Sequence, residues 1–369
     1  MISFLAKKVG PIGLDIGYNS IKMLQFAQNN GQIRVAAAEK VQFKSDLGDD
    51  ADARKDFIVK SIRDAIRRGQ FSGTKVVSCI PNDNIKIRSL RLDPTEIENV
   101  EQLVKDELAE RFEYNPDRDE IRYITAGKVY NGSEIKNEVI FFATDRATIE
   151  NHITLLEEAG LAPDGIDPVP CSLIRSFQRS MRRQADQARI RSFIDVGDLY
   201  TTVIIGSCDQ IYFIKQIPSG GKNLNEHVSS KLGIGIEESV LLRSKIQHGN
   251  TDTINESVIR SVNDAISQGV EELIREISLC FKYCAVTFRG HHPEEIILTG
   301  GEAYESVFTE ALAATLNLEV NIARPLQGVE LSGSSYVWDQ GSELCEWAVA
   351  AGLGYKNWQV NNYAGANNE

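Results

Sequence analysis

The chain has 369 residues, a formal net charge of −12 and 42% hydrophobic residues. This length favours two related domains over a single hydrophobic core. The negative charge disfavours a nucleic-acid binder, whose affinity depends on Lys and Arg at the phosphates. The six cysteines form no CxxC pair, which disfavours a zinc site. No run reaches the roughly 18 apolar residues of a membrane-spanning helix, so we expect no direct membrane insertion.

The first half of the chain begins with strand-like segments and continues with a helix. Apolar residues dominate the strands, and the turn Asn29-Asn30-Gly31 separates the second strand from the third. The helix is amphipathic, and the strand after it ends at Pro81. The expected order is strand, strand, strand, helix, strand, at 12–16, 21–27, 33–43, 54–68 and 75–80.

A stretch without a counterpart in the second half follows, and we interpret it as an inserted subdomain covering about 82–165. It contains a helix near 95–112, strands near 120–129 and 138–143, and a helix near 146–159 that ends at Gly160.

The second half repeats the order of the first. Strands are expected at 193–196, 201–205 and 210–217, one long or kinked helix at 255–288, and a strand at 295–299 before Gly300. This repeat predicts a duplicated α/β domain. The expected units are domain I (1–185, including the insert), domain II (186–340), a closing helix that packs back on domain I (341–356) and a polar tail (357–369).

The first glycine loop has the composition of a phosphate-binding turn. Gly17 lets the backbone approach a phosphate closely, and Lys22 can add a positive charge. Asp15 needs a bridging cation near a phosphate, so its expected role is to hold Mg²⁺ through water. The alternative is a β-hairpin whose Asp and Gly only satisfy turn geometry. The amides expected to face the phosphate belong to Tyr18, Asn19 and Ser20.

Three further glycine turns strengthen the nucleotide-binding interpretation. Asp195 and Gly197 repeat the spacing of Asp15 and Gly17, so Asp195 is the second candidate metal ligand. Two more turns lie where a strand enters a helix, and a flat base can lie on bare glycine backbone there. The other candidate contacts in these turns are Thr201, Thr202, Gly220, Gly221, Lys222, Gly300, Gly301 and Glu302.

Recognised catalytic patterns are absent from the sequence. It contains no HExxH motif and no GxxxxGK[ST] loop, and its five histidines are scattered. Beyond the two loop aspartates there is no candidate base for deprotonating a sugar hydroxyl. Any phosphoryl chemistry is expected to be slow ATP hydrolysis through positioning and metal alone.

The sequence resembles the actin-like ATPase superfamily and, within it, PilM-type proteins of type IV pilus assembly, which are related to FtsA. The resemblance runs from residue 12 to about 354. It rests on the glycine loops and, most specifically, on Glu158-Ala159-Gly160-Leu161-Ala162-Pro163 followed by Ile166-Asp167 and Ser172-Leu173. The implied α/β fold has two duplicated ribonuclease-H-like domains and an inserted FtsA/PilM-type α+β subdomain.

The resemblance also implies a role. Such proteins bind ATP with Mg between the two halves and hold the N-terminal cytoplasmic peptide of a PilN-like inner-membrane protein near the inserted subdomain. It implies a cytoplasmic protein, peripheral at the inner face of the cytoplasmic membrane, between other pilus platform proteins and motor ATPases.

Four positions depart from the family pattern. Val240 and Arg243 stand where the family often carries Glu and Lys on the helix beside the base, so Arg243 becomes the candidate contact there. Glu302 and Asp198 stand where small residues are usual. Two alternatives remain beside the scaffold interpretation: an FtsA-like cytoskeletal ATPase and a small-molecule kinase of the same superfold. A scaffold that has lost its nucleotide is a further option.

Overall fold

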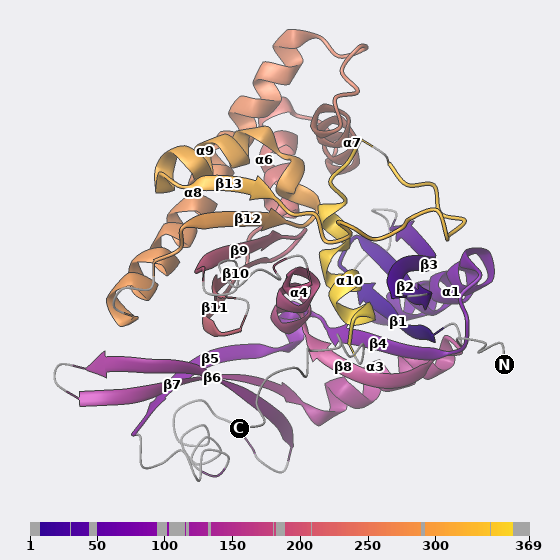
Figure 1. The fold of residues 1–369 in the computed structure, drawn as a ribbon. Helices are drawn as coiled ribbons and strands as arrows, with labels where there is room; N and C mark the ends of the chain where they lie inside the picture. Colours follow the sequence, from indigo (N-terminus) through magenta and orange to yellow (C-terminus); the bar gives the residue numbers. More distant parts are fainter. Residues whose placement is uncertain are drawn as a thin grey trace.

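In the part of the chain that it describes, the computed structural model contains three β-sheets with helices around them (Figure 1). The predicted helix near 95–112, apart from residue 102, and the predicted tail 357–369 lie outside the residues that the structure describes. Those residues are 8–29, 31–43, 50–93, 102, 115, 118–131, 134–179, 181, 189–207, 209–288, 292–339 and 341–356.

The first sheet has the strand order β3-β2-β1-β4-β8. β1 pairs antiparallel with β2 and parallel with β4, and β8 extends the sheet parallel to β4. Its inner strands are almost fully buried, because both faces are covered, and they read as continuous apolar runs. The strands are β1 (Lys8–Ile16), β2 (Ser20–Asn29), β3 (Gln32–Gln42), β4 (Lys75–Ile80) and β8 (Ala162–Pro168).

The second sheet repeats this topology with the order β11-β10-β9-β12-β13. β9 pairs antiparallel with β10 and parallel with β12, and β13 is parallel to β12. The same order and the same strand directions in both sheets confirm the duplication predicted from the glycine loops. The strands are β9 (Arg191–Val196), β10 (Thr201–Gly206), β11 (Ile211–Ile217), β12 (Glu295–Thr299) and β13 (Glu319–Ile322).

The helices flank the sheets, and the two longest of those described, α1 and α8, begin at residues whose side chains cap them. Asp50 caps α1 by accepting from the amides of Asp52 and Ala53, and Asn255 caps α8 by accepting from Ser257. The predicted long helix is one 32-residue helix, α8. The helices are α1 (Ala51–Gly69), α3 (Arg146–Glu158), α4 (Val169–Gln178), α6 (Gly221–Leu232), α7 (Ile236–Gln247), α8 (Glu256–Thr287), α9 (Ser306–Leu316) and α10 (Ala348–Gly354).

A separate three-stranded sheet with the order β5-β7-β6 comes from the predicted insert. It lies along β11 of the second sheet, and Ile87, Ala126 and Phe142 share a hydrophobic core with the second half. The insert therefore belongs to the first half by sequence and packs on the second. Its strands are β5 (Lys86–Leu92), β6 (Asp119–Asn131) and β7 (Glu134–Asp145).

α4 and α10 lie side by side between the two five-stranded sheets (Figure 1). Glycines allow this close packing. A Cβ at Gly13 would overlap with the Ala350 carbonyl of α10, and one at Gly352 would overlap with the Ser172 carbonyl of α4. α10 thus closes against β1 and α4.

Three strands did not follow from the sequence pattern. β8 contains Pro163, Gly165 and Pro168, so its composition is not that of a strand, and its pairing with β4 stabilises it. Residues 162–165 fall inside the range predicted for the insert, yet they pair in the first sheet. β5 and β13 are the other two.

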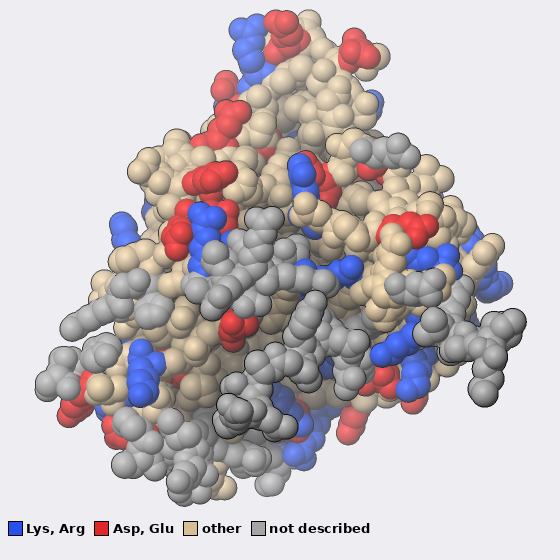
Figure 2. All heavy atoms as spheres, viewed as in Figure 1, with Lys and Arg blue, Asp and Glu red and all other residues tan. Residues whose placement is uncertain are grey.

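The surface carries both signs of charge in small groups. On the face shown in Figure 2, basic and acidic side chains are interspersed among uncharged ones. No helix among the described residues is long and apolar enough to cross a membrane.

Candidate nucleotide site between the two halves

The two predicted Asp-x-Gly loops are equivalent turns between paired strands. In the first, the Gly17 amide donates to the Ser20 carbonyl at 2.9 Å, and in the second the Gly197 amide donates to the Tyr200 carbonyl at 3.0 Å. The acids end the preceding strands: Asp15 lies on β1 and Asp195 on β9. The repeat in sequence is therefore a repeat in backbone geometry.

The two acids lie close enough to affect one another. Asp195 is half-buried, and its desolvation, together with the negative charge of Asp15, raises its pKa from 3.8 to about 7. Lys22 opposes this shift, since its Nζ lies 3.2 Å from a carboxylate oxygen of Asp15. Burial lowers the pKa of Lys22, but Asp15, Glu346 and Asp195 raise it to a net value above 10.5. Lys22 is therefore a buried cation among acids.

The two turns touch across the boundary between the halves. The Asn19 Nδ2 donates to Asp198 at 3.3 Å, joining the first turn to the second. The Lys222 Nζ lies 5.9 Å from the centre of the Tyr18 ring. The structure thus brings together the loop at Gly17, the loop at Gly197 and the turn at 218–222.

The remaining two glycine turns pack against the second turn. The amides of Gly221 and Lys222, at the start of α6, donate to the carbonyls of Gly197 and Asp198 at 3.0 and 2.8 Å. Gly300 has φ +93, and a Cβ there would overlap with the Val196 backbone. All four predicted loops therefore converge, and a side chain at Gly300 is excluded by both strain and space.

The predicted hydroxyls are buried, and two of them have protein partners. Thr201 donates to the Ser219 carbonyl at 2.8 Å, which holds the turn before α6. Thr202 accepts from Asn82 at 3.4 Å. Ser20 is only 3% exposed. Their expected contacts with phosphate remain a prediction, and the structure assigns Thr201 a structural bond.

Two positions that depart from the family pattern, Arg243 and Glu302, belong to one network of hydrogen bonds. The Arg243 guanidinium, 2% exposed, donates from Nη2 to Glu302 at 2.6 Å and to Glu305 at 3.1 Å. Its Nη1 donates to Asn225 at 2.7 Å. The Glu302 carboxylate lies where a Cβ on Gly221 would be. Arg243 and Glu302, two candidate nucleotide contacts, thus bind each other.

Two residues of the site, Asn82 and Glu346, were not predicted from the sequence. Asn82 follows β4 and bridges the halves, since its Oδ1 accepts from Gln216 at 2.8 Å and its Nδ2 donates to Thr202. Glu346 precedes α10, accepts from Lys40 and Tyr304, and raises the pKa of Lys22. A polar residue directly after a buried strand was the available signal for Asn82.

The acids have the chemistry of a site for a hydrated cation. No described side chain hydrogen-bonds to the Asp195 carboxylate, and desolvation and the charge of Asp15 raise its pKa despite the opposing charge of Lys22. A divalent cation bound through water between Asp15 and Asp195 would supply further positive charge. Among the described residues no group of three or more Asp, Glu, His or Cys side chains surrounds a metal position. The chain thus offers two carboxylates, and phosphate oxygens and water would complete the shell.

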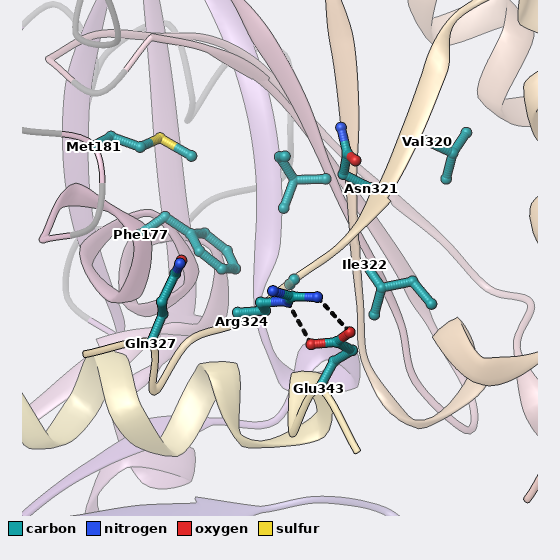
Figure 3. Close-up of a pocket in the computed structure, with 10 residues that line it drawn as sticks. Phe177, Met181, Val320, Asn321, Ile322, Arg324, Gln327 and Glu343 are labelled. Carbon is teal, nitrogen blue, oxygen red and sulfur yellow. Dashed lines mark hydrogen bonds and ion pairs between the residues drawn. The ribbon is translucent and has the colours of Figure 1, made fainter. Parts of the chain in front are cut away.

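A cavity of about 500 Å³ lies elsewhere, between α4 and the strands β12 and β13 (Figure 3). Phe177 and Met181 line one side, and a bidentate ion pair between Arg324 and Glu343 crosses its floor in this view. None of its lining residues belongs to the glycine turns. The cavity is therefore separate from the candidate nucleotide site.

The chain was compared with models of known protein families and with solved structures. A family model described as "Type IV pilus assembly protein PilM" matches residues 13–358. The chain belongs to this family. The match includes both sheets, the insert and α10.

Solved structures agree with the family. A PilM–PilN type IV pilus biogenesis complex superimposes with a TM-score of 0.77 at 17% identity, covering 94% of this chain and 98% of that one. The ethanolamine utilization protein EutJ from Carboxydothermus hydrogenoformans gives a TM-score of 0.56 at 13% identity, covering 95% and 90%. The chain therefore has the actin-like ATPase fold, as the resemblance implied.

Cell division proteins are also similar to part of the chain. FtsA of Streptococcus pneumoniae is 23% identical over 243 residues, covering 60% of this chain and 52% of FtsA. FtsA of Bacillus subtilis is 23% identical over 264 residues, covering 66% and 58%. The match thus spans little more than half the length of these relatives.

Proposed function

We propose that this protein is a nucleotide-binding scaffold of a type IV pilus platform at the inner face of the cytoplasmic membrane. ATP binds with Mg²⁺ between the two halves, and the N-terminal peptide of a PilN-like membrane protein binds beside the inserted sheet. The other platform proteins and motor ATPases are its neighbours there.

The observation that carries the nucleotide site is the position of Asp15 and Asp195. They end equivalent strands, lie close enough to raise the pKa of Asp195 to about 7, and stand beside four converging glycine turns. A Mg²⁺ ion with phosphate oxygens would offset the repulsion between the acids. The turns then supply backbone approach to the phosphates, and the nucleoside extends toward Gly300 and α7.

An apolar surface beside the insert supports the peptide site. Leu279, Tyr283 and Val286 lie at helical spacing on the outside of α8 and are 52%, 40% and 77% exposed. Arg91 of β5 contacts Tyr283 and Thr287, so this stripe borders the inserted sheet. Exposed apolar residues in a row mark an interaction surface. The solved PilM–PilN complex is consistent with a PilN-like partner.

Hydrogen–deuterium exchange with each ligand tests both sites. MgATP should slow exchange in the turns at 16–20, 196–202, 218–222 and 299–302. A synthetic peptide from the start of the PilN-like protein of the same organism should slow exchange in β5, β7 and the end of α8. Protection spread evenly over the chain, or confined to other elements, would contradict the assignment.

A matched pair of valines sharpens the peptide test. Val286→Asp places a charge in the α8 stripe, and Val337→Asp makes the same change at a residue that is 89% exposed and far from the insert in sequence. Peptide affinity should fall about tenfold in the first variant, because a desolvated charge opposes apolar contact. It should be unchanged in the second. Equal peptide affinity in the two variants would show that the peptide does not bind at the α8 stripe.

A further inference from the structure

The Glu302 carboxylate lies at the start of α6, against the backbone of Gly221. A Cβ at Gly221 would overlap with it, so the contact depends on glycine. The first turn of α6 has no acidic residue of its own. The amides of Gly221 and Lys222 already donate to carbonyls of the second turn, so Glu302 acts here through its charge and the space it fills.

Arg243 and Gln247 hold this carboxylate from α7. Arg243 Nη2 donates to Glu302 at 2.6 Å, and Gln247 Nε2 donates to it at 3.0 Å. The Glu302 side chain is 14% exposed and the Arg243 side chain 2% exposed. Glu302 therefore closes the space between α6, α7 and the Gly300–Gly301 turn.

The carboxylate also adds negative charge next to the second loop. Burial and the charge of Glu302 raise the pKa of Asp198 from 3.8 to about 6, against the opposing effect of Lys222 and Arg243. An anionic ligand entering here meets the negative charges of Glu302 and Asp198. A Mg²⁺ ion bound at Asp15 and Asp195 would not neutralise the charges of Glu302 and Asp198.

We propose, on the basis of the nucleotide site proposed above, that Glu302 is an internal competitor that keeps the nucleoside part of a nucleotide out of this space. A nucleotide binds fully only after the Glu302 carboxylate leaves Gly221 and Arg243. The resting protein accordingly binds Mg-nucleotides weakly, and Glu302 sets that affinity.

Glu305 makes the release of Glu302 possible. It accepts from the same Arg243 Nη2 at 3.1 Å and from Gln247 at 3.2 Å, and it is 3% exposed. When Glu302 leaves, Arg243 keeps one buried carboxylate, so no unpaired charge is left in the interior. Arg243 Nε, which has no partner among the described residues, is a free donor toward the incoming ligand.

Calorimetric titration of the full chain with MgATP and with magnesium tripolyphosphate tests the proposal. Glu302→Ala removes the carboxylate, and Glu302→Gln removes only its charge, should the first variant fold poorly. Glu305→Gln is the matched control, because it also removes one charge and one partner of Arg243 but does not touch Gly221. MgATP should bind Glu302→Ala about tenfold more tightly than the wild type. Glu305→Gln should show no gain.

Tripolyphosphate separates the two proposals because it carries phosphates without a nucleoside. Its affinity should change less than that of MgATP in Glu302→Ala. Equal MgATP affinity in the wild type and both Glu302 variants would overturn the role of Glu302 alone. An equal gain in Glu305→Gln would overturn it as well. Absence of both MgATP and tripolyphosphate binding in every variant would instead overturn the nucleotide site itself.

A second readout needs no nucleotide. In Glu302→Gln the pKa of Asp198, followed by carboxyl NMR, should fall from about 6 toward its ordinary value, because a neighbouring negative charge is gone. Glu305→Gln should leave it nearly unchanged. An unshifted Asp198 in Glu302→Gln would show that the Glu302 carboxylate does not lie where the proposal needs it.

Discussion

In the first half of the molecule Asp15 lies directly opposite Lys22 in the strand register, whereas in the second half Asp195 lies opposite Thr202. The two hairpins share strand order, strand direction and turn geometry. Opposite residues in an antiparallel pair point to the same face, so each partner decides the charge around its acid. The two hairpins thus have the same backbone arrangement, but the residue opposite the aspartate is a cation in the first and a neutral threonine in the second.

Because of this difference, the two aspartates have different electrostatic surroundings. Asp15 forms an ion pair with Lys22, while the half-buried Asp195 lies opposite the neutral Thr202 and has a pKa that desolvation and the charge of Asp15 raise to about 7. A bound cation therefore gains most from Asp195. In the proposed site, a metal-bound ligand would add positive charge at the second hairpin, whereas the first hairpin already carries Lys22.

Neutralising the acid of the first hairpin should have the largest effect on stability. Asp15→Asn leaves Lys22, 12% exposed, without its closest partner. A buried charge that loses its partner costs about 3 kcal/mol. Urea unfolding of the ligand-free protein should show this loss. Unchanged stability in Asp15→Asn would mean that Lys22 does not depend on Asp15.

Neutralising Asp195 in the second hairpin should increase stability, and by less than the loss expected for Asp15→Asn. The pKa of Asp195 is higher in the folded chain, so the folded state binds more protons than the unfolded state between about pH 4 and 7. Wild-type stability should therefore decline as pH rises through this window. Asp195→Asn removes the decline and should add about 2 kcal/mol at pH 7.5.

Urea unfolding at pH 4 and pH 7.5 checks the second prediction and supplies its control. At pH 4 the wild type and Asp195→Asn should be nearly equal in stability, because both are neutral there. A variant that is destabilised at both pH values would contradict the raised pKa, and with it the contrast between the hairpins.

Much of the fold could be predicted because the duplicated units have strong local signals. The strands before and after Gly17 and Gly197 are apolar runs bounded by turn residues, and their pattern predicts four of the five strands in each sheet. β8 could not be predicted, because its prolines and glycine favour a loop, and pairing with β4 overrides that preference. Tertiary pairing is invisible to local propensity.

The candidate site divides in the same way. The turns were predictable, because glycine and aspartate at fixed spacing have a local cause. The partners of their side chains were not. Arg243 and Glu302 are 59 residues apart in sequence, and each was a separate departure from the family pattern until the structure joined them. The ion pair between Lys22 and Asp15 was not predicted, and the expected contact of Lys22 with a phosphate stays a prediction.

The central claim is that Asp15 and Asp195 hold one Mg-nucleotide between the two halves. The most direct measurement is the MgATP affinity of the wild type, Asp15→Ala and Asp195→Ala, with and without Mg²⁺, on protein shown by circular dichroism to be folded. We expect Mg-dependent binding in the wild type and a loss of at least about 100-fold in each variant, since each removes a metal contact. Unchanged MgATP affinity in both variants would contradict the claim.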